Sequence, residues 1–135
     1  MSMIVRTGVD IVFIPRVQHL LVEYAERFTR RVYTSQEIVT CNGRASAFAV
    51  RWAAKEAIAK LLGVGIAGLG SGADAVNCLD IEIIRLPSGK PHVQLHGRAS
   101  TCAQAQYLST FEISLSHDGD YAVASAVAIG QVPAQ

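Results

Sequence analysis

The segment 45–62 carries the strongest helical pattern of the chain and constrains the fold most. Its apolar side chains recur at spacings of four, three and four residues, with Ile58 beside the stripe: Val50, Ala54, Ala57 and Leu61. Gly63 follows directly, and glycine often ends a helix because it adopts the left-handed conformation without strain. In a chain of 135 residues, this helix predicts one domain, residues 1–135, built around it.

Strand patterns lie on both sides of this helix. Residues 3–11 are rich in β-branched side chains and predict a first strand. After the helix come two pairs of strands, each joined by a turn that contains glycine: 80–86 with 92–96, and 111–115 with 121–129. Each pair predicts an antiparallel hairpin.

Three further helices are expected. Pro15 suits the first turn of a helix whose apolar pattern continues to Phe28. Thr34 or Ser35 caps a short helix that has an acidic residue in its first turn. Residues 98–108 predict an alanine-rich helix. Strands and helices that mix in this order predict an α+β domain.

Charge is distributed unevenly along the chain. Half of the residues are hydrophobic, 17% are charged and the net charge is +1, which excludes a disordered chain and a generic nucleic-acid binder. Residues 1–60 hold nine Lys or Arg against five Asp or Glu, whereas residues 61–135 hold three against six. The first part therefore presents a positive face to an anionic ligand or an acidic protein, or it carries charges that only solvate helices.

The cysteines and the N-terminal residues predict a cytoplasmic protein. Cys41, Cys78 and Cys102 are odd in number and widely spaced, so they indicate reduced thiols and neither a disulfide framework nor a zinc site. The first residues lack the apolar core of a signal peptide. The longest uncharged apolar run, 61–73, is short and rich in glycine, so no membrane association is expected.

The glycine-rich stretch after the long helix has the residue spacing of a phosphate-binding motif but not its structural context. Residues 63–68 read G-x-G-x-x-G, but they follow a helix and lead into more loop, so a dinucleotide site of the usual type is excluded. A connecting loop and a close approach of Gly65 backbone to a ligand phosphate both remain open.

Four polar residues are the candidates for chemistry. Asp10 comes near the end of the first strand, and Glu56 lies one helical turn before Lys60. Two carboxylates that meet phosphate oxygens are what Mg²⁺ requires, although Glu56 and Lys60 alone are also typical of a surface ion pair. His117 directly follows a strand, where it is positioned to contact a phosphate, to move a proton or simply to face solvent.

Two sequence segments resemble the signatures of the holo-acyl-carrier-protein synthase family. The first reads Gly8-Val9-Asp10-Ile11 with Arg16, and the second reads Arg51-Trp52-Ala53-Ala54-Lys55-Glu56-Ala57 with Lys60. Weaker agreement comes from three other stretches: Arg27 to Glu37, Ser88-Gly89-Lys90-Pro91 and Ile113 to His117. The similarity extends from residue 4 to about residue 128, and the long connection from Gly65 to Leu79 departs from it.

The resemblance implies a reaction and a set of roles. Such enzymes have the 4′-phosphopantetheinyl transferase fold, an antiparallel sheet packed against a long helix. They transfer 4′-phosphopantetheine from coenzyme A to a serine of apo acyl carrier protein and require Mg²⁺. By similarity, Asp10 and Glu56 hold the metal and do not form surface ion pairs, while Glu56, Lys60 and His117 are catalytic. The base that accepts the serine proton stays open between Glu56 and a metal-bound water.

Substrate contacts are implied in the same way. Coenzyme A is expected at the following residues: Arg51, Lys60, Gly65, Gly89, Lys90, Pro91 and His117. Arg16 and Arg27, helped by Arg30 or Arg31, are expected to dock an acidic helix of the carrier protein.

Helix geometry makes a further demand on this site. At about 100° per residue, Arg51 and Glu56 point roughly 140° apart around the long helix, so one ligand hardly reaches both within one subunit. Family members of this short type are homotrimers with active sites between subunits. We therefore expect a homotrimer with residues 121–129 in the interface. In each shared site, one subunit supplies Asp10, Glu56 and Lys60, and its neighbour supplies Arg51, Lys90 and His117.

Two other functions compete with this hypothesis. A non-catalytic module of the same fold would bind coenzyme A or carrier protein without turnover. An unrelated Mg²⁺ phosphohydrolase would need similar metal ligands. The presence of Asp10, Glu56 and Lys60 together favours the transferase over the binding module.

Overall fold

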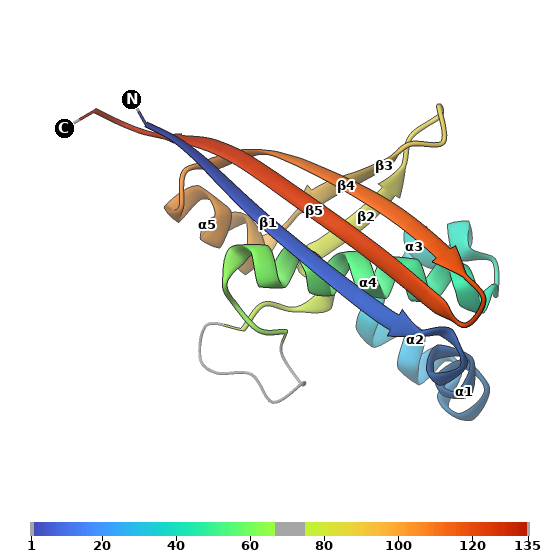
Figure 1. The fold of residues 1–135 in the computed structure, drawn as a ribbon. Coiled ribbons are helices and arrows are strands. Elements are labelled where there is room, and N and C mark those ends of the chain that lie inside the picture. The colour runs from blue at the N-terminus through green and yellow to red at the C-terminus, as the bar shows by residue number, and fades with distance from the viewer. Residues whose placement is uncertain (1, 67–74, 135) are drawn as a thin grey trace.

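Two antiparallel sheets and five α-helices form the structure, a computed structural model that describes residues 2–66 and 75–134 (Figure 1). Strand β1 (Ser2–Phe13) pairs with β5 (Tyr121–Val132), which pairs with β4 (Leu108–Asp118). Strands β2 (Ile81–Arg85) and β3 (Pro91–Leu95) form a separate hairpin. The expected α+β class and both expected hairpins are confirmed.

Helix α4 (Ala45–Leu62) is the centre of the molecule and has the bounds that its sequence pattern predicts. It lies against one face of the β1-β5-β4 sheet, while the other helices and the hairpin surround its remaining sides (Figure 1). Most of its side chains are buried, not one stripe alone, and these include Arg51 and Lys55. Small alanines on nearly every side let neighbouring elements approach this closely.

Gly8 is the point of closest approach between β1 and α4. A Cβ atom built on Gly8 would lie 2.0 Å from the backbone oxygen of Ala57, so only glycine fits there. Successive strand residues alternate between the two faces, so Asp10 points to the same side of β1 as Gly8. The Gly-x-Asp sequence therefore brings a carboxylate to α4 at the place where the backbones nearly touch.

The expected helix from Pro15 to Phe28 is two helices. Helix α1 (Ile14–Tyr24) carries Pro15 in its first turn as predicted, but it ends at Ala25, and α2 (Glu26–Val32) starts anew. Ala25 has φ 47° and ψ −122°, which no helix continues through. The apolar pattern runs on across this break because both helices pack against the same core.

The short helix α3 (Ser35–Cys41) is capped as predicted. The Thr34 hydroxyl accepts a hydrogen bond from the Glu37 N–H, and the Glu37 carboxylate accepts one from the Thr34 N–H. Glu37 is only 1% exposed, so its side chain does more than cap a helix.

Helix α5 (Gly97–Ala105) is shorter than the expected helix 98–108. Tyr107 has φ 60°, and Leu108 already belongs to β4. Leu108 is buried in the core, so an alanine-rich helix and an apolar strand were merged in the sequence pattern. A short 3₁₀ turn, Cys78–Asp80, precedes β2.

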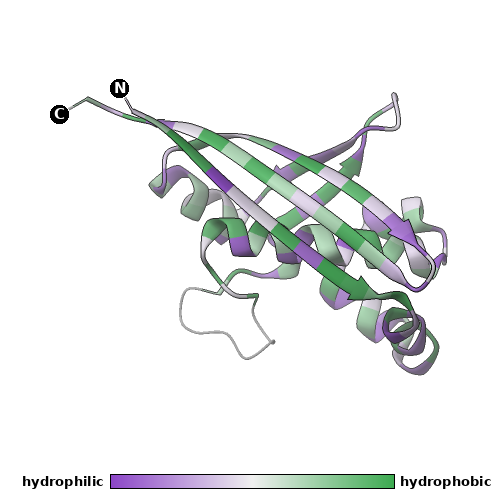
Figure 2. Cartoon of the chain, in the orientation of Figure 1, coloured by the Kyte–Doolittle hydropathy of each residue, from purple (hydrophilic) through white to green (hydrophobic). Residues whose placement is uncertain are grey.

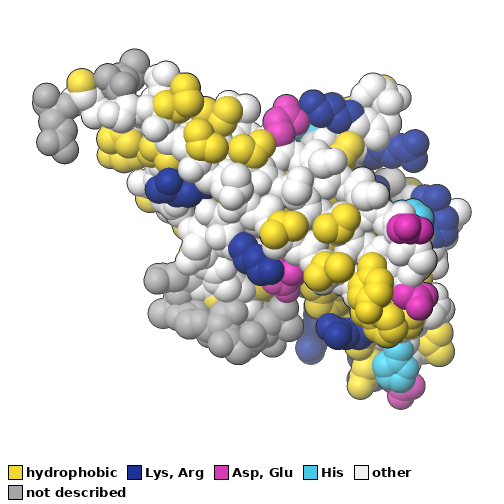
Figure 3. Space-filling model, in the orientation of Figure 1, with side chains coloured by type: hydrophobic (Ala, Val, Ile, Leu, Met, Phe, Trp, Pro, Cys, Tyr) yellow, Lys and Arg dark blue, Asp and Glu magenta, His cyan; other side chains and the backbone are white. Residues whose placement is uncertain are grey.

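The outer face of the β1-β5-β4 sheet carries exposed apolar side chains. Phe13 stands opposite Tyr121, Ile11 opposite Val123, and Val5 opposite Ile129. Many residues of β1 and β5 are hydrophobic (Figure 2), and hydrophobic side chains gather on the outer face near both ends of these strands (Figure 3). The alternate alanines of β5 are buried on the opposite side, which packs against α4. Ile11, for example, is 64% exposed. We call this surface the outer apolar face.

The described residues hold no helix with both the length and the apolar character needed to cross a bilayer. All three cysteines are free thiols, as the sequence predicted. Burial raises the pKa of both Cys41 and Cys78 to about 11, so these two groups stay protonated near neutral pH.

Candidate active site

Two pockets flank α4 and share no lining residue. The first, here the carboxylate pocket, has a volume of about 350 Å³ and lies between β1, α1 and α4. Its polar lining residues are Asp10, Arg16, Trp52 and Glu56. The second, here the cationic pocket, has a volume of about 390 Å³ and lies between α4, the β2–β3 hairpin and β4. It is lined by Arg44, Arg51, Arg85, Gly89, Pro91 and His117, among others.

Glu56 is a half-buried carboxylate of the carboxylate pocket. Trp52 donates a hydrogen bond from Nε1 to Glu56 Oε1 at 3.3 Å, which fixes the side chain one turn along α4. Burial raises the pKa of Glu56, the Trp52 hydrogen bond opposes this, and the nearby Asp10 carboxylate raises the pKa further. The Glu56 and Asp10 carboxylates are therefore close enough in one pocket to repel each other.

This pair of carboxylates fits a hard divalent cation. Mg²⁺ is commonly bound by one or two carboxylates together with substrate phosphates and waters. A cation between Asp10 and Glu56 would remove the repulsion that raises the Glu56 pKa. Within residues 2–66 and 75–134 no group of three or more His, Cys, Asp and Glu side chains gathers as a self-sufficient metal site. A Mg²⁺ ion held by these two carboxylates would complete its coordination with waters and substrate phosphates.

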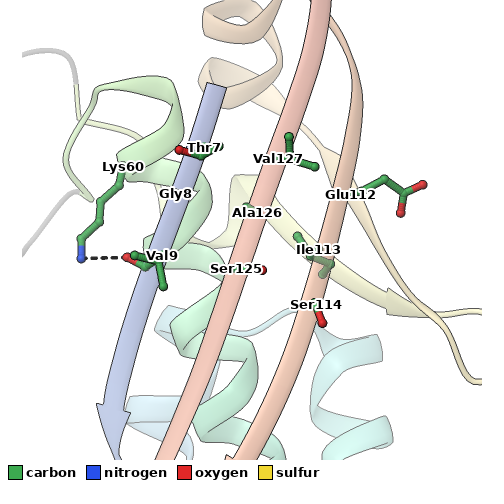
Figure 4. A pocket seen from close by; sticks show the side chains of 10 residues that line it. All are labelled: Thr7, Gly8, Val9, Lys60, Glu112, Ile113, Ser114, Ser125, Ala126 and Val127. Atoms are coloured by element: carbon green, nitrogen blue, oxygen red, sulfur yellow. Dashed lines mark hydrogen bonds between the residues drawn. The ribbon is translucent and has the colours of Figure 1, made fainter. Parts of the chain in front are cut away.

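Lys60 is bound to Asp10 and not to Glu56. Its Nζ donates to Asp10 Oδ1 at 2.9 Å. The same Nζ donates to the Val9 carbonyl oxygen at 3.1 Å, at the outer edge of β1 (Figure 4). The expectation that Asp10 takes part in no ion pair is therefore wrong in this structure. The Lys60 side chain is 56% exposed, so it has room to turn toward an anionic ligand.

Arg51 gives the cationic pocket a buried and incompletely bonded donor. Its side chain is 9% exposed and donates to the Ala47 carbonyl oxygen at 3.0 Å, yet its Nε, although buried, has no hydrogen-bond partner among the described residues. A buried donor without a partner is unfavourable unless a ligand completes it. Arg44, Arg85 and His117 line the same pocket, so an anion is the chemistry that suits it.

Three of the residues expected to contact coenzyme A lie outside the cationic pocket. Lys90 follows Gly89 but pairs with Glu112 at 3.0 Å, and both side chains are about half exposed. Gly65 lies in an exposed stretch after α4, where its oxygen accepts the Val76 N–H, and it lines neither pocket. Lys60 is on the other flank of α4. Gly68 and the other glycines up to residue 72 lie outside the described residues.

The two arginines expected to dock a carrier protein lie next to the carboxylate pocket. Arg16 lines that pocket. Arg27 stacks over the Tyr24 ring at 5.6 Å in an adjoining groove that shares Leu20 and Trp52 with it. Both arginines are thus on the Asp10 side of α4.

Three site residues were not singled out from the sequence. Trp52 orients Glu56, and in the sequence it was named only as part of the second signature segment, without a role. Arg44 and Arg85 reach the cationic pocket from segments that are far apart in the chain. Nothing local marks either of them, because only the packing of the hairpin on α4 brings them together.

Comparison with known proteins adds a family to this geometry. Residues 6–126 match the sequence pattern of the 4′-phosphopantetheinyl transferase superfamily. The chain is 44% identical over 124 residues to a holo-[acyl-carrier-protein] synthase of Herpetosiphon aurantiacus, covering 92% of this chain and 98% of the relative. It is 42% identical over 129 residues to the enzyme of the same name from Gloeobacter violaceus, covering 93% and 92%.

Solved structures agree in fold. A Helicobacter pylori holo-[acyl-carrier-protein] synthase in complex with coenzyme A is 31% identical, with a TM-score of 0.78 over 90% of this chain and 98% of that one. A Plasmodium yoelii acyl carrier protein synthase with ADP bound is 28% identical, with a TM-score of 0.81 over 98% and 100%. The chain belongs to the 4′-phosphopantetheinyl transferase superfamily. The fold class implied by the sequence resemblance is confirmed.

Proposed function

We propose that this protein is a holo-acyl-carrier-protein synthase. It transfers 4′-phosphopantetheine from coenzyme A to a serine of apo acyl carrier protein and releases adenosine 3′,5′-bisphosphate. The observation that carries this is the pairing, on one helix, of a carboxylate pocket with a cationic pocket, in a chain related over most of its length to enzymes of that name. The alternative of a non-catalytic binding module is not favoured.

The reaction joins the serine oxygen to the phosphorus that bears pantetheine. The phosphoanhydride bond breaks, the adenosine bisphosphate leaves with the bond electrons, and the serine hydroxyl loses its proton. Mg²⁺ held by Asp10 and Glu56 would supply positive charge to the pyrophosphate oxygens. Lys60, already at Asp10, adds a second positive charge at the same place. Glu56 or a water beside it accepts the proton.

The cationic pocket would hold the nucleotide end of coenzyme A. Arg51, whose Nε has no hydrogen-bond partner in the part of the chain that the structure describes, lines this pocket together with Arg44, Arg85 and His117. Gly89 and Pro91 shape the pocket wall at the hairpin turn. Lys90 would exchange its exposed pair with Glu112 for a phosphate, which costs little because surface ion pairs are weak. Gly65 is retained as a nucleotide contact by family resemblance only.

The separation of the pockets supports a homotrimer with shared sites. Asp10 and Glu56 line a pocket on one flank of α4, and Arg51 lines a pocket on another flank. One coenzyme A molecule can therefore contact both pockets only if two subunits contribute one pocket each. The outer apolar face supplies a surface for such contacts, because large exposed apolar patches on soluble proteins commonly mark interfaces. We propose that β1 and β5 of each subunit line the trimer interface.

Two further assignments complete the proposal. Residues 1–135 form one transferase domain, since the family pattern covers 6–126 and a solved relative is covered in full. Three free thiols and a carrier-protein substrate suit the reducing cytoplasm.

A mass assay tests the activity. Purified protein is incubated with coenzyme A, Mg²⁺ and an apo carrier protein, and the carrier is expected to gain the mass of one phosphopantetheine group. No mass gain with bound coenzyme A would indicate the binding module, and hydrolysis of coenzyme A without transfer would indicate a phosphohydrolase. A panel of carrier proteins, run with coenzyme A and with an acyl derivative, would then define the substrates.

Subunit mixing tests the shared site. Glu56→Ala and His117→Ala should each be inactive or nearly so, and mixing them under subunit exchange should restore part of the activity. Restoration is expected because some interfaces then combine an intact carboxylate pocket with an intact cationic pocket. A mixture that regains nothing despite proven exchange, or a fully active monomer, contradicts the trimer.

A further inference from the structure

A buried ion pair lies behind the cationic pocket and lines neither that pocket nor the carboxylate pocket. Lys55 is 0% exposed and Glu37 is 1% exposed, and Lys55 Nζ lies 2.9 Å from Glu37 Oε1. Helix α4 supplies the lysine and α3 supplies the glutamate. Burying two charges is costly unless the surrounding groups complete their hydrogen bonds, so the partners of this pair indicate what it holds in place.

Those partners are backbone groups of the β2–β3 hairpin and the turn before it. Lys55 Nζ donates to the Ile81 carbonyl oxygen at 2.6 Å and to the Cys78 carbonyl oxygen at 2.9 Å. Glu37 Oε2 accepts the Ile83 N–H at 3.0 Å. The ammonium group thus has three acceptors and the carboxylate bonds through both oxygens.

The pair occupies the edge of β2 that pairs with no strand within residues 2–66 and 75–134. At both ends of the hairpin, even-numbered residues form the backbone hydrogen bonds between the two strands. The Leu86 N–H donates to the Lys90 carbonyl oxygen, and the His96 N–H donates to the Asp80 carbonyl oxygen. The odd-numbered Ile81 and Ile83 therefore turn their polar groups away from β3. Glu37 and Lys55 meet those groups where another strand would otherwise pair.

The clamped residues directly precede the wall of the cationic pocket. Ile84 and Arg85, which line that pocket, follow Ile83 in the same strand, and Gly89 closes the turn beyond them. Arg51 lies one helical turn before Lys55, so the two side chains leave α4 on nearly the same side. The ion pair thereby joins the helix that carries Arg51 to the strand that carries Arg85.

We infer that Glu37 and Lys55 are positioning residues that set the distance between α4 and the β2–β3 hairpin, and with it the shape of the coenzyme A pocket. The inference rests on the proposed function for the identity of the ligand, but not for the clamp itself. Neither residue touches the ligand. Their loss should therefore weaken coenzyme A binding while leaving carrier-protein recognition on the opposite flank intact.

The test uses the double variant Glu37→Leu/Lys55→Met, which removes both charges and the side-chain oxygen that accepts the Ile83 N–H, at similar volume. Such replacements often fold, because no buried charge is left without its partner. We expect a folded protein whose Ile83 amide exchanges hydrogen at least about tenfold faster, since its carboxylate acceptor is gone. The Kd and KM for coenzyme A should rise about tenfold or more, with KM for carrier protein unchanged and kcat altered less.

Leu108→Ala is the matched control, because Leu108 is buried but lines neither pocket. It should lower stability without changing the Kd for coenzyme A. If the double variant does not fold, Glu37→Asp replaces it, since the shorter side chain keeps the charge but loses reach to Ile83. A folded variant with unchanged coenzyme A affinity, or with unchanged Ile83 exchange, overturns the inference. If the wild type binds no coenzyme A, the proposed function is wrong. The rate of hydrogen exchange at the Ile83 amide then tests on its own whether Glu37 and Lys55 hold the hairpin in place.

Discussion

The carboxylate pocket and the cationic pocket are built in different ways. Two stretches of chain make the first, from Asp10 to Leu20 and from Trp52 to Glu56. Three distant stretches make the second, and its charges come from α4, from a hairpin and from the end of β4. The first is fixed by one close contact between a strand and a helix, and the second by a buried ion pair behind it.

This contrast shows how a small domain divides an anionic substrate. A phosphoanhydride needs a cation at the bond that breaks and a broader positive surface for the remaining phosphates. The three arginines of the cationic pocket lie on the other flank of α4 from Asp10 and Glu56, so they do not compete with a cation for these carboxylates. In the proposed homotrimer, a second subunit completes the site.

The largest expected effect comes from removing a carboxylate. Glu56→Gln should lower kcat for transfer by about a thousandfold or more, because the charge at the breaking bond is lost while the side-chain volume is kept. Coenzyme A affinity should fall much less. Arg51→Gln is the matching change on the other flank, and it should raise the Kd for coenzyme A more than it lowers kcat. Equal effects of the two variants on both quantities would break the distinction between the pockets.

The second-largest expected effect is a loss of stability in Gly8→Ala. The added methyl would strike the Ala57 carbonyl, so β1 must move away from α4, at an expected cost of about 2–3 kcal/mol in the free energy of unfolding. Gly119→Ala is the control: nothing lies within 4 Å, so only its positive φ of 58° costs stability, about 1 kcal/mol. Urea denaturation compares them. A Gly8→Ala protein as stable as the control would show that β1 does not need this contact.

Arg16→Glu should act mainly on the carrier protein. Reversing a charge beside the carboxylate pocket should raise KM for carrier protein about tenfold at low salt, and less as salt screens the interaction. KM for coenzyme A should stay within about twofold, since the cationic pocket lies on the other flank. Parallel changes in both KM values would count against docking at Arg16.

The smallest expected effect is on the pH dependence of stability, through Glu82 in the β2–β3 hairpin. Burial would raise the pKa of Glu82, but hydrogen bonds from Thr34 at 2.7 Å and from His96 at 3.0 Å outweigh it, and the pKa is lowered. This stabilisation is present above the ordinary glutamate pKa and is lost as the pH falls through the lowered value. Wild type should therefore exceed Glu82→Gln in stability by about 1 kcal/mol near neutral pH and lose that advantage in acid. A difference that is constant with pH would refute the assignment.

Much of the fold was accessible from sequence because its signals are local. The bounds of α4, the cap of α3 by Thr34 and both hairpins follow from side-chain spacing and turn residues. The break between α1 and α2 at Ala25 was not predictable, because the residue is not a glycine and the apolar pattern continues through it. Leu108 was assigned to the wrong element for a similar reason, since a buried leucine suits either a helix or a strand.

The site was accessible only where it lies on one helix or one strand. The sequence motifs placed Asp10 and Glu56 as neighbours, and the structure lines one pocket with both. The partner of Lys60 was not predictable, because helix spacing favours Glu56 while the approach of β1 offers Asp10. Arg85 and the clamp of Lys55 on Ile81 depend on how the hairpin packs, which no local pattern encodes.

The break at Ala25 changes how the charges near the carboxylate pocket are arranged. In one continuous helix, Arg16 and Arg27 would stand on almost the same side, about 16 Å apart along a straight line. The break turns that line into a corner, with one arginine on each arm. A straight acidic helix can follow a line over its whole length, but it meets a corner at one register and one angle. If Arg16 and Arg27 dock an acidic partner, as the family resemblance implies, a single residue in an unusual conformation would thus constrain the direction from which that partner arrives.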